Sequence, residues 1–274
     1  MNVAGFLERV REWADTRDDI QAVAVVGSQA RAETPADRWS DIDVLLVVGD
    51  VEPFIESATW LEPLGSPLLT FIEATAVGGS LERRVLFESG EEVDFAVFPA
   101  GTIADLSGAE EVLVLRRGHR FLLDRMGLAE HFAARAGGPA PVQAHDLPQL
   151  SHEFWYRVLW AAKKLRRGEV WIAFRSCNTD LQSLLVNLLR WRMEQKGVDA
   201  WHDGRFLERW ADEQTLARLR GATARYDEDD VARVLNAIAD LFADVERDYA
   251  EAAGLPLPVN QAEIRRRLRD VLMS

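Results

Sequence analysis

The sequence predicts an α+β protein: a mixed β-sheet flanked by helices, followed by a helical bundle. Three observations support this fold class. The first half of the 274-residue chain alternates short β-branched runs with helical stretches. Residues 136–148 contain two glycines and three prolines without hydrophobic periodicity, which is typical of a linker. The remaining residues show long helical periodicity. We therefore expect one domain over residues 1–138 and a second over residues 146–274.

The elements of the first domain follow from local patterns. Helical spacing of apolar residues predicts helices at Val3–Thr16, Pro53–Trp60 and Arg125–Ala136. β-branched or alternating runs predict strands at Ile20–Val26, Asp41–Val48, Leu68–Glu73, Val85–Glu88, Glu92–Phe98 and Glu111–Arg116. Ser89, Gly90 and Glu91 form a turn that would join two of these strands into a hairpin.

The second domain reads as a series of helices. Asp146 is suited to cap a helix that carries Pro148 in its first turn and ends near Arg167, before Gly168. A single long helix is expected at Val170–Lys196. Further helices are expected near Phe206–Arg220, Asp229–Ala252 and Gln261–Leu272. Several helices with short connections predict a bundle.

Composition narrows the class of protein. The net charge of −13 argues against a nucleic-acid partner, because such binding depends on Lys and Arg neutralising phosphates. The acidity suits a polycationic ligand, or it simply keeps the protein soluble. No apolar run approaches the roughly 20 residues that cross a bilayer. Residues 1–6 lack a basic start followed by an apolar stretch, so we do not expect secretion. A single cysteine, Cys177, excludes an internal disulfide. We expect a cytoplasmic protein without a membrane partner.

Three aspartates are the candidate metal-binding and catalytic residues. Asp41 and Asp43 lie two residues apart at the start of an apolar strand, so their side chains face the same way. Asp94 lies in a later strand with apolar residues on both faces, where a carboxylate is costly unless it is paired or bound to a metal. Such carboxylates indicate a divalent-metal site that handles phosphate. The alternative for Asp94 is a strand-end aspartate bonded to backbone amides.

A second motif precedes the aspartates. Gly27 and Ser28 end a strand and are expected to open a short helix over Gln29–Glu33. Glycine lets the backbone approach a ligand, and the free amides with the serine hydroxyl can hold a phosphate. Arg31 could add a cation for the same phosphates. Taken alone, the Gly-Ser pair also fits an ordinary turn, and the arginine also fits a solvated surface.

Together these motifs resemble the nucleotidyltransferase superfamily related to DNA polymerase β. Local sequence is similar to the aminoglycoside 6-adenylyltransferases, or streptomycin adenylyltransferases, at residues 26–31, 39–43 and 86–95. The helical half adds Glu153-Phe154-Trp155, Ala162-Lys163 and Trp191. The resemblance implies a nucleotidyltransferase domain followed by a helical substrate-binding domain.

The resemblance also implies roles for single residues. Asp41 and Asp43 would bind Mg²⁺, with two ions expected, and Asp94 would share a metal or take the proton from the attacking hydroxyl. The triphosphate of ATP would be contacted by Gly27, Ser28 and Arg31, and by Lys163 from the helical domain. By spacing alone, Lys163 belongs to a charged helix face that also fits a solvated surface.

The implied activity is ATP- and Mg²⁺-dependent transfer of AMP to a hydroxyl of a small cationic antibiotic, an aminoglycoside, with release of pyrophosphate. Three alternatives stay open: a lincosamide acceptor, a protein side chain as acceptor, and a catalytically silent nucleotide- or drug-binding protein of the same fold. The sequence leaves open which hydroxyl is modified and the oligomeric state.

Overall fold

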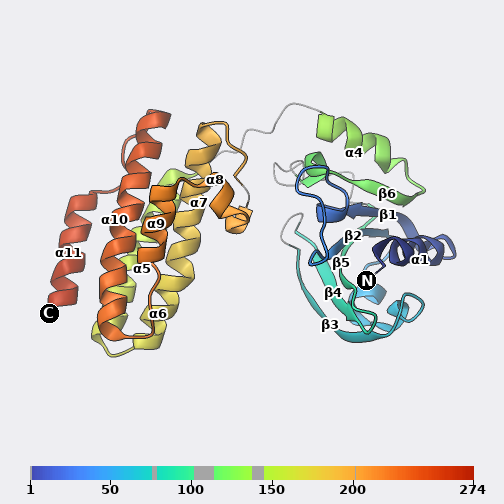
Figure 1. The fold of residues 1–274 in the computed structure, drawn as a ribbon, viewed down its shortest axis with the longest axis horizontal. Coiled ribbons are helices and arrows are strands. Elements are labelled where there is room, and N and C mark those ends of the chain that lie inside the picture. The colour runs from blue at the N-terminus through green and yellow to red at the C-terminus, as the bar shows by residue number, and fades with distance from the viewer. Residues whose placement is uncertain (1, 76–78, 102–113, 138–144, 201) are drawn as a thin grey trace. The chain divides into compact units, whose positions relative to one another are not determined.

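The computed structural model describes residues 2–75, 79–101, 114–137, 145–200 and 202–274 (Figure 1). The chain divides into two compact units, Met1–Gln143 and Ala144–Ser274. The first unit holds a six-stranded mixed sheet with helices, and the second is helical. The predicted α+β class is confirmed. Among the helices described, none combines the length and apolar character that crossing a membrane requires.

The first unit is built around its sheet. Its described helices include α1 (Val3–Asp15), α2 (Glu52–Glu56) and α4 (Leu128–Gly137). Its strands are β1 (Ile20–Val26), β2 (Ile42–Val48), β3 (Pro67–Ala74), β4 (Leu81–Phe87), β5 (Glu92–Pro99) and β6 (Arg120–Asp124). The strand order is β3-β4-β5-β2-β1-β6, with β2 and β5 parallel and the other neighbouring pairs antiparallel. Strand β5, which carries Asp94, is therefore internal, as its apolar faces predict.

The two faces of the sheet bury different apolar clusters. On one face, Phe6 of α1 packs with strand residues such as Leu46 and Phe95. On the other face, Phe132 of α4 packs with the alternate strand residues, such as Val47. Because side chains alternate along a strand, this two-sided burial explains why the strands β1, β2 and β5 are almost continuously apolar. The hairpin turn predicted between β4 and β5 is confirmed, with Gly90 at φ 93°.

Two predicted elements of the first unit, one helix and one strand, are wrong in part. Pro53–Trp60 is not one helix, because the chain turns extended at Ser57, between α2 and a 3₁₀ turn at Thr59–Leu61. The strand predicted at Glu111–Arg116 is helical over residues 114–116, and residues 111–113 lie outside the described part. Strand β6, which the sequence did not predict, pairs with the edge of β1.

The helix predicted from Arg125 begins only at Leu128. The carboxylate of Asp124 accepts hydrogen bonds from the amides of Leu128 and Ala129, at 3.0 and 2.9 Å, and so caps α4 at this point. Gly127 adopts φ 73°, which a helix does not allow. The start of α4 is therefore fixed by one side chain acting on the backbone.

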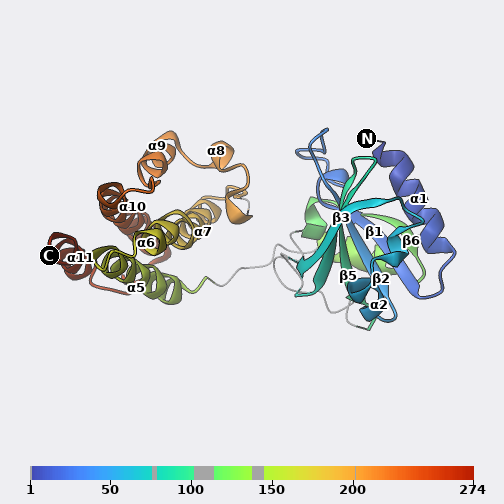
Figure 2. The same ribbon diagram turned by 90° about the horizontal axis from the view of Figure 1, so that it is seen from below.

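The second unit packs long helices side by side, several of them seen nearly end-on in Figure 2. The elements are α5 (Leu147–Arg166), α6 (Val170–Asn178), α7 (Asp180–Gln195), a 3₁₀ turn (His202–Gly204), α8 (Leu207–Trp210), α9 (Glu213–Gly221), α10 (Glu228–Ala253) and α11 (Gln261–Met273). As predicted, Asp146 caps α5 by accepting the amide of Gln149 at 2.9 Å. The fully buried Glu246 of α10 joins three helices, since it accepts hydrogen bonds from Trp155 of α5 and Gln261 of α11.

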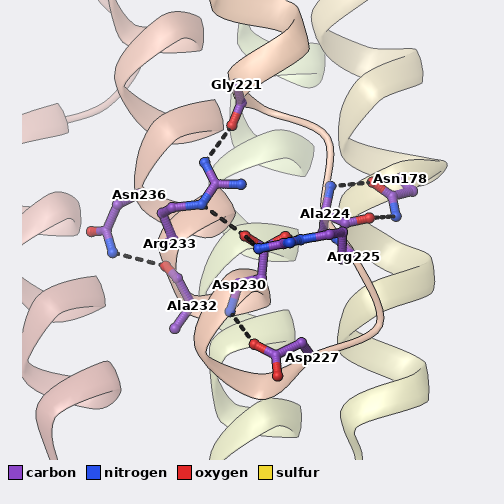
Figure 3. Close-up of polar contacts among 9 residues, drawn as sticks. All are labelled: Asn178, Gly221, Ala224, Arg225, Asp227, Asp230, Ala232, Arg233 and Asn236. Atoms are coloured by element: carbon purple, nitrogen blue, oxygen red, sulfur yellow. Dashed lines mark hydrogen bonds and ion pairs between the residues drawn. The ribbon is translucent and has the colours of Figure 1, made fainter.

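The long helix predicted at Val170–Lys196 is wrong, because the chain breaks at Thr179 into α6 and α7. The φ and ψ angles of Thr179 are −123° and −77°, outside the helical region. The amide side chain of Asn178 bonds both the N–H and the C=O of Ala224, at 2.8 and 2.9 Å (Figure 3). This contact joins the end of α6 to the segment before α10, and no Gly or Pro in the sequence signals the break.

Candidate active site

A glycine turn begins the site. Strand β1 ends at Val26, and Gly27 follows with φ 63° in a 3₁₀ turn, Gly27–Gln29. Val26 pairs with Asp43 on β2, so the turn passes directly over this carboxylate. A Cβ atom at position 27 would overlap the Asp43 carboxylate. Both the backbone angle and the lack of space therefore require glycine here.

The rest of the Gly-Ser motif is held by the chain around it. The buried Ser28 hydroxyl donates to the carbonyl of Asp41 at 3.4 Å, as does the Gln29 side chain. Arg31 donates through Nε to the carbonyl of Thr34 at 2.7 Å. The helix predicted at Gln29–Glu33 is wrong, because the helical turn begins earlier, at Gly27, and ends at Gln29. The chain after it folds back, with Thr34 at φ 49° and the amide of Ala36 donating to the Ser28 carbonyl.

Strand register brings the three aspartates together. Asp43 on β2 lies directly beside Asp94 on β5 in the parallel pair, and Asp41 precedes Asp43 on the same face. One carboxylate oxygen from each of the three lies within 4.8 Å of the other two. The three aspartates, called the triad below, occupy the sheet face that α4 covers, because Asp43 and Asp94 alternate with the core residues of the opposite face.

Burial and the neighbouring carboxylates make the ionised form of Asp94 unfavourable. Asp94 is 9% exposed, and burial raises the pKa of its carboxyl to about 7; Arg84 lowers that pKa, and the charges of Asp43 and Asp41 raise it. A guanidinium nitrogen of Arg84 lies 3.4 Å from the carboxylate. Three carboxylate oxygens at this spacing are the hard ligands that Mg²⁺ prefers, and a cation would relieve their repulsion. The residues present therefore fit a divalent ion.

Lys163 lies apart from these residues in the chain, on α5 of the second unit. Its side chain is exposed, and the neighbouring Lys164 pairs with Glu169 at 2.8 Å. The first unit thus brings together five of the predicted residues, namely Gly27, Ser28, Asp41, Asp43 and Asp94. Arg31 lies shortly after the Gly27 turn, where its side chain donates to the Thr34 carbonyl.

The structure adds Arg84, which the sequence analysis missed. The predicted strand began at Val85, whereas β4 begins at Leu81 and pairs Arg84 with Asp94. The run from Leu81 to Phe87 includes Glu82, Arg83 and Arg84, and these charges obscured the strand pattern. The signal would have been their place directly before a hairpin whose second strand carries Asp94.

Comparison with known proteins assigns the class and the family. A family model described as streptomycin adenylyltransferase matches residues 2–270, nearly the whole chain. The chain is therefore a nucleotidyltransferase enzyme, the class that the paired strand aspartates indicate. Within this class, it belongs to the streptomycin adenylyltransferase family. The resemblance seen in the sequence is confirmed.

Individual relatives are distant. An aminoglycoside 6-adenylyltransferase of Bacillus subtilis (strain 168) is 24% identical over 196 residues, which cover 68% of this chain and 67% of the relative. Another of that name from Campylobacter jejuni is 21% identical over 225 residues, 77% and 75% of the two chains. A crystal structure of an aminoglycoside 6-adenyltransferase from Bacillus subtilis aligns over 98% of both chains, with a TM-score of 0.47 and 18% identity.

Proposed function

We propose that this enzyme transfers AMP from ATP to a hydroxyl of an aminoglycoside and releases pyrophosphate, with Mg²⁺ held by the triad. The observation that carries the proposal is the convergence of Asp41, Asp43 and Asp94 within 4.8 Å beside the Gly27 turn. Membership of the streptomycin adenylyltransferase family supports the reaction, and the names of the two relatives support the class of acceptor.

In this proposal the first unit positions the nucleotide. Gly27 lets the backbone approach the triphosphate, with Ser28 and Arg31 on the same turn, and Lys163 of the helical unit supplies a further cation. Bound Mg²⁺ would neutralise part of the triphosphate charge that otherwise repels a hydroxyl nucleophile. The helical unit, residues 146–274, would contribute to acceptor binding.

The proposed reaction is an in-line displacement at the α-phosphorus. The acceptor hydroxyl oxygen forms a bond to this atom while the bond to the bridging oxygen of pyrophosphate breaks. Asp41 and Asp43 would hold the ion, and Asp94 would share it or take the proton of the hydroxyl. Asp94 is suited to either role by its place on the neighbouring strand, in register with Asp43.

A pyrophosphate-release assay over a panel of aminoglycosides, with ATP and Mg²⁺, tests the proposal. We expect turnover with at least one aminoglycoside, loss of turnover on chelation of the metal, and a decrease of at least about 100-fold in Asp41→Asn and Asp94→Asn. Asp18→Asn is the matched control, because Asp18 is an exposed aspartate just before β1. Unchanged turnover in both triad variants would remove the site assignment. ATP binding without turnover on any aminoglycoside would contradict the acceptor class.

A further inference from the structure

The sheet face that carries the triad continues to the edge strand β3. Strand pairing sets Asp94 beside Arg84 on β4, and Arg84 beside Phe71 on β3. Directly paired residues of neighbouring strands lie on the same face of a sheet. Phe71 therefore belongs to the same row as Asp43 and Asp94. With strands spaced 4.7–4.9 Å apart, it lies about 10 Å from Asp94, a distance that a molecule of several linked rings spans.

The β3 end of this face is apolar and open. The side chains of Phe71 and Leu69 are 49% and 51% exposed. They lie two residues apart on the same face of β3, and Leu69 pairs with the half-buried Leu86 of β4. We call these three residues, Leu69, Phe71 and Leu86, the β3 patch. An exposed phenylalanine ring offers a large flat apolar area that a ligand can cover.

Negative charge borders the β3 patch. Glu73 follows Phe71 on the same face of β3 and forms an ion pair with Arg84. The buried Glu82 lies 3.0 Å from the same guanidinium, which also contacts Asp94. Three carboxylates thus share one cation, so the group keeps an excess of negative charge. Such a border favours a cationic ligand over an anionic one.

We propose that the β3 patch binds a ring of the acceptor, with the apolar C–H face of the ring against Phe71 and its cationic groups toward Glu73 and Glu82. The inference rests on the proposed function and deepens it, because it names residues that select a cationic, ring-containing acceptor. ATP is anionic, so the charge border disfavours it at this place. The acceptor would then approach the triad from the β3 edge of the sheet.

Phe71→Ala tests this proposal, with streptomycin as the probe if the wild type uses it, or otherwise the best acceptor of the panel. Phe71→Trp keeps the ring, and Leu81→Ala is the matched control, because Leu81 is 42% exposed and alternates with Glu82, on the opposite face. We measure KM for the acceptor and for ATP, and the acceptor Kd by calorimetry. In F71A, KM and Kd for the acceptor should rise about tenfold, the loss of one aromatic contact, while KM for ATP stays unchanged. F71W and L81A should behave like the wild type.

Glu73→Gln provides a second, independent variant. Its side chain is 42% exposed, so the substitution should leave folding intact. We expect a weaker acceptor affinity that differs most from the wild type at low ionic strength, where charge attraction is least screened.

Three outcomes would overturn the proposal that the β3 patch binds the acceptor. The first is an unchanged acceptor KM and Kd in F71A, and the second is an equal loss in L81A. The third is a wild-type dimer by light scattering that F71A converts to a monomer, which would assign the patch to a second copy of the chain. Failure of the proposed function looks different, since the wild type would then neither modify nor bind any aminoglycoside.

Discussion

At the scale of the residue, the site depends on how closely Gly27 approaches Asp43. The chain leaves β1 with a left-handed angle, φ 63°, and passes over the carboxylate with no room for a side chain. Two requirements meet at this position, and they are separable. The positive φ lowers the stability of the fold when any other residue stands at this position, because the backbone is then strained. The overlap, in contrast, would displace Asp43, one member of the triad.

Gly27→Ala should show both effects. We expect a loss of stability of about 1 kcal/mol from the positive φ, and a decrease in AMP transfer of about 100-fold or more because Asp43 must move. Gly254→Ala is the matched control: Gly254 has φ 66° at the end of α10, and a Cβ there would meet nothing within 4 Å. Urea denaturation and the pyrophosphate assay measure the two quantities. Equal activities of the two variants would contradict the role of the overlap.

At the scale of the element, a network of polar contacts fixes the start of α10 (Figure 3). Asp227 caps the helix by accepting the amide of Asp230 at 2.9 Å. The carboxylate of Asp230 accepts the amide of Arg225 at 2.7 Å and Nε of Arg233 at 2.9 Å. Arg233 in turn donates to the carbonyl of Gly221, the last residue of α9, at 2.7 Å. One carboxylate therefore ties α10 to the end of α9 and the loop between them.

This network predicts a pH dependence of stability. The hydrogen bond from Arg233, followed by the one from the Arg225 amide, holds the pKa of Asp230 below its ordinary value. A lowered pKa in the folded state stabilises above the unfolded pKa of about 3.9, and this contribution is lost as the pH falls through and below it. The difference in unfolding free energy between the wild type and Asp230→Asn should therefore be largest near neutral pH and shrink below about pH 4.

Urea denaturation of both proteins across this pH range measures the difference. Asp229→Asn is the control, because Asp229 is an exposed acidic residue of the same helical turn. It should show a much smaller pH-dependent difference. The difference in unfolding free energy between Asp230→Asn and the wild type could instead stay constant from neutral pH to about pH 3. That result would contradict the stabilising role of an ionised, hydrogen-bonded carboxylate at Asp230.

At the scale of the whole molecule, charge should govern the choice of acceptor. The net charge is −13, and the triad face adds a local excess of carboxylates around Arg84. A polycationic acceptor is attracted by both, whereas a lincosamide carries little charge. Raising the ionic strength from about 0.1 to 1 M shortens the screening length from about 10 to 3 Å.

We therefore expect KM for an aminoglycoside to rise several-fold over this range of salt, at saturating ATP and Mg²⁺. The measurement is a salt titration of steady-state turnover, with a lincosamide as the weakly charged comparison. An aminoglycoside KM that does not change with salt would show that charge does not select the acceptor.

The sequence by itself determined the α+β class, most of the strands, and the aspartates that the structure brings together. These follow from local signals: strand periodicity, turn residues and two carboxylates spaced for one face of a strand. Tertiary structure alone decided the break at Thr179, the pairing of β6 with β1, and the place of Arg84. Each depends on a partner far away in the chain, such as Ala224 for Asn178 or Asp94 for Arg84. Local propensity does not encode which distant group satisfies a hydrogen bond or a charge, so those features required the fold.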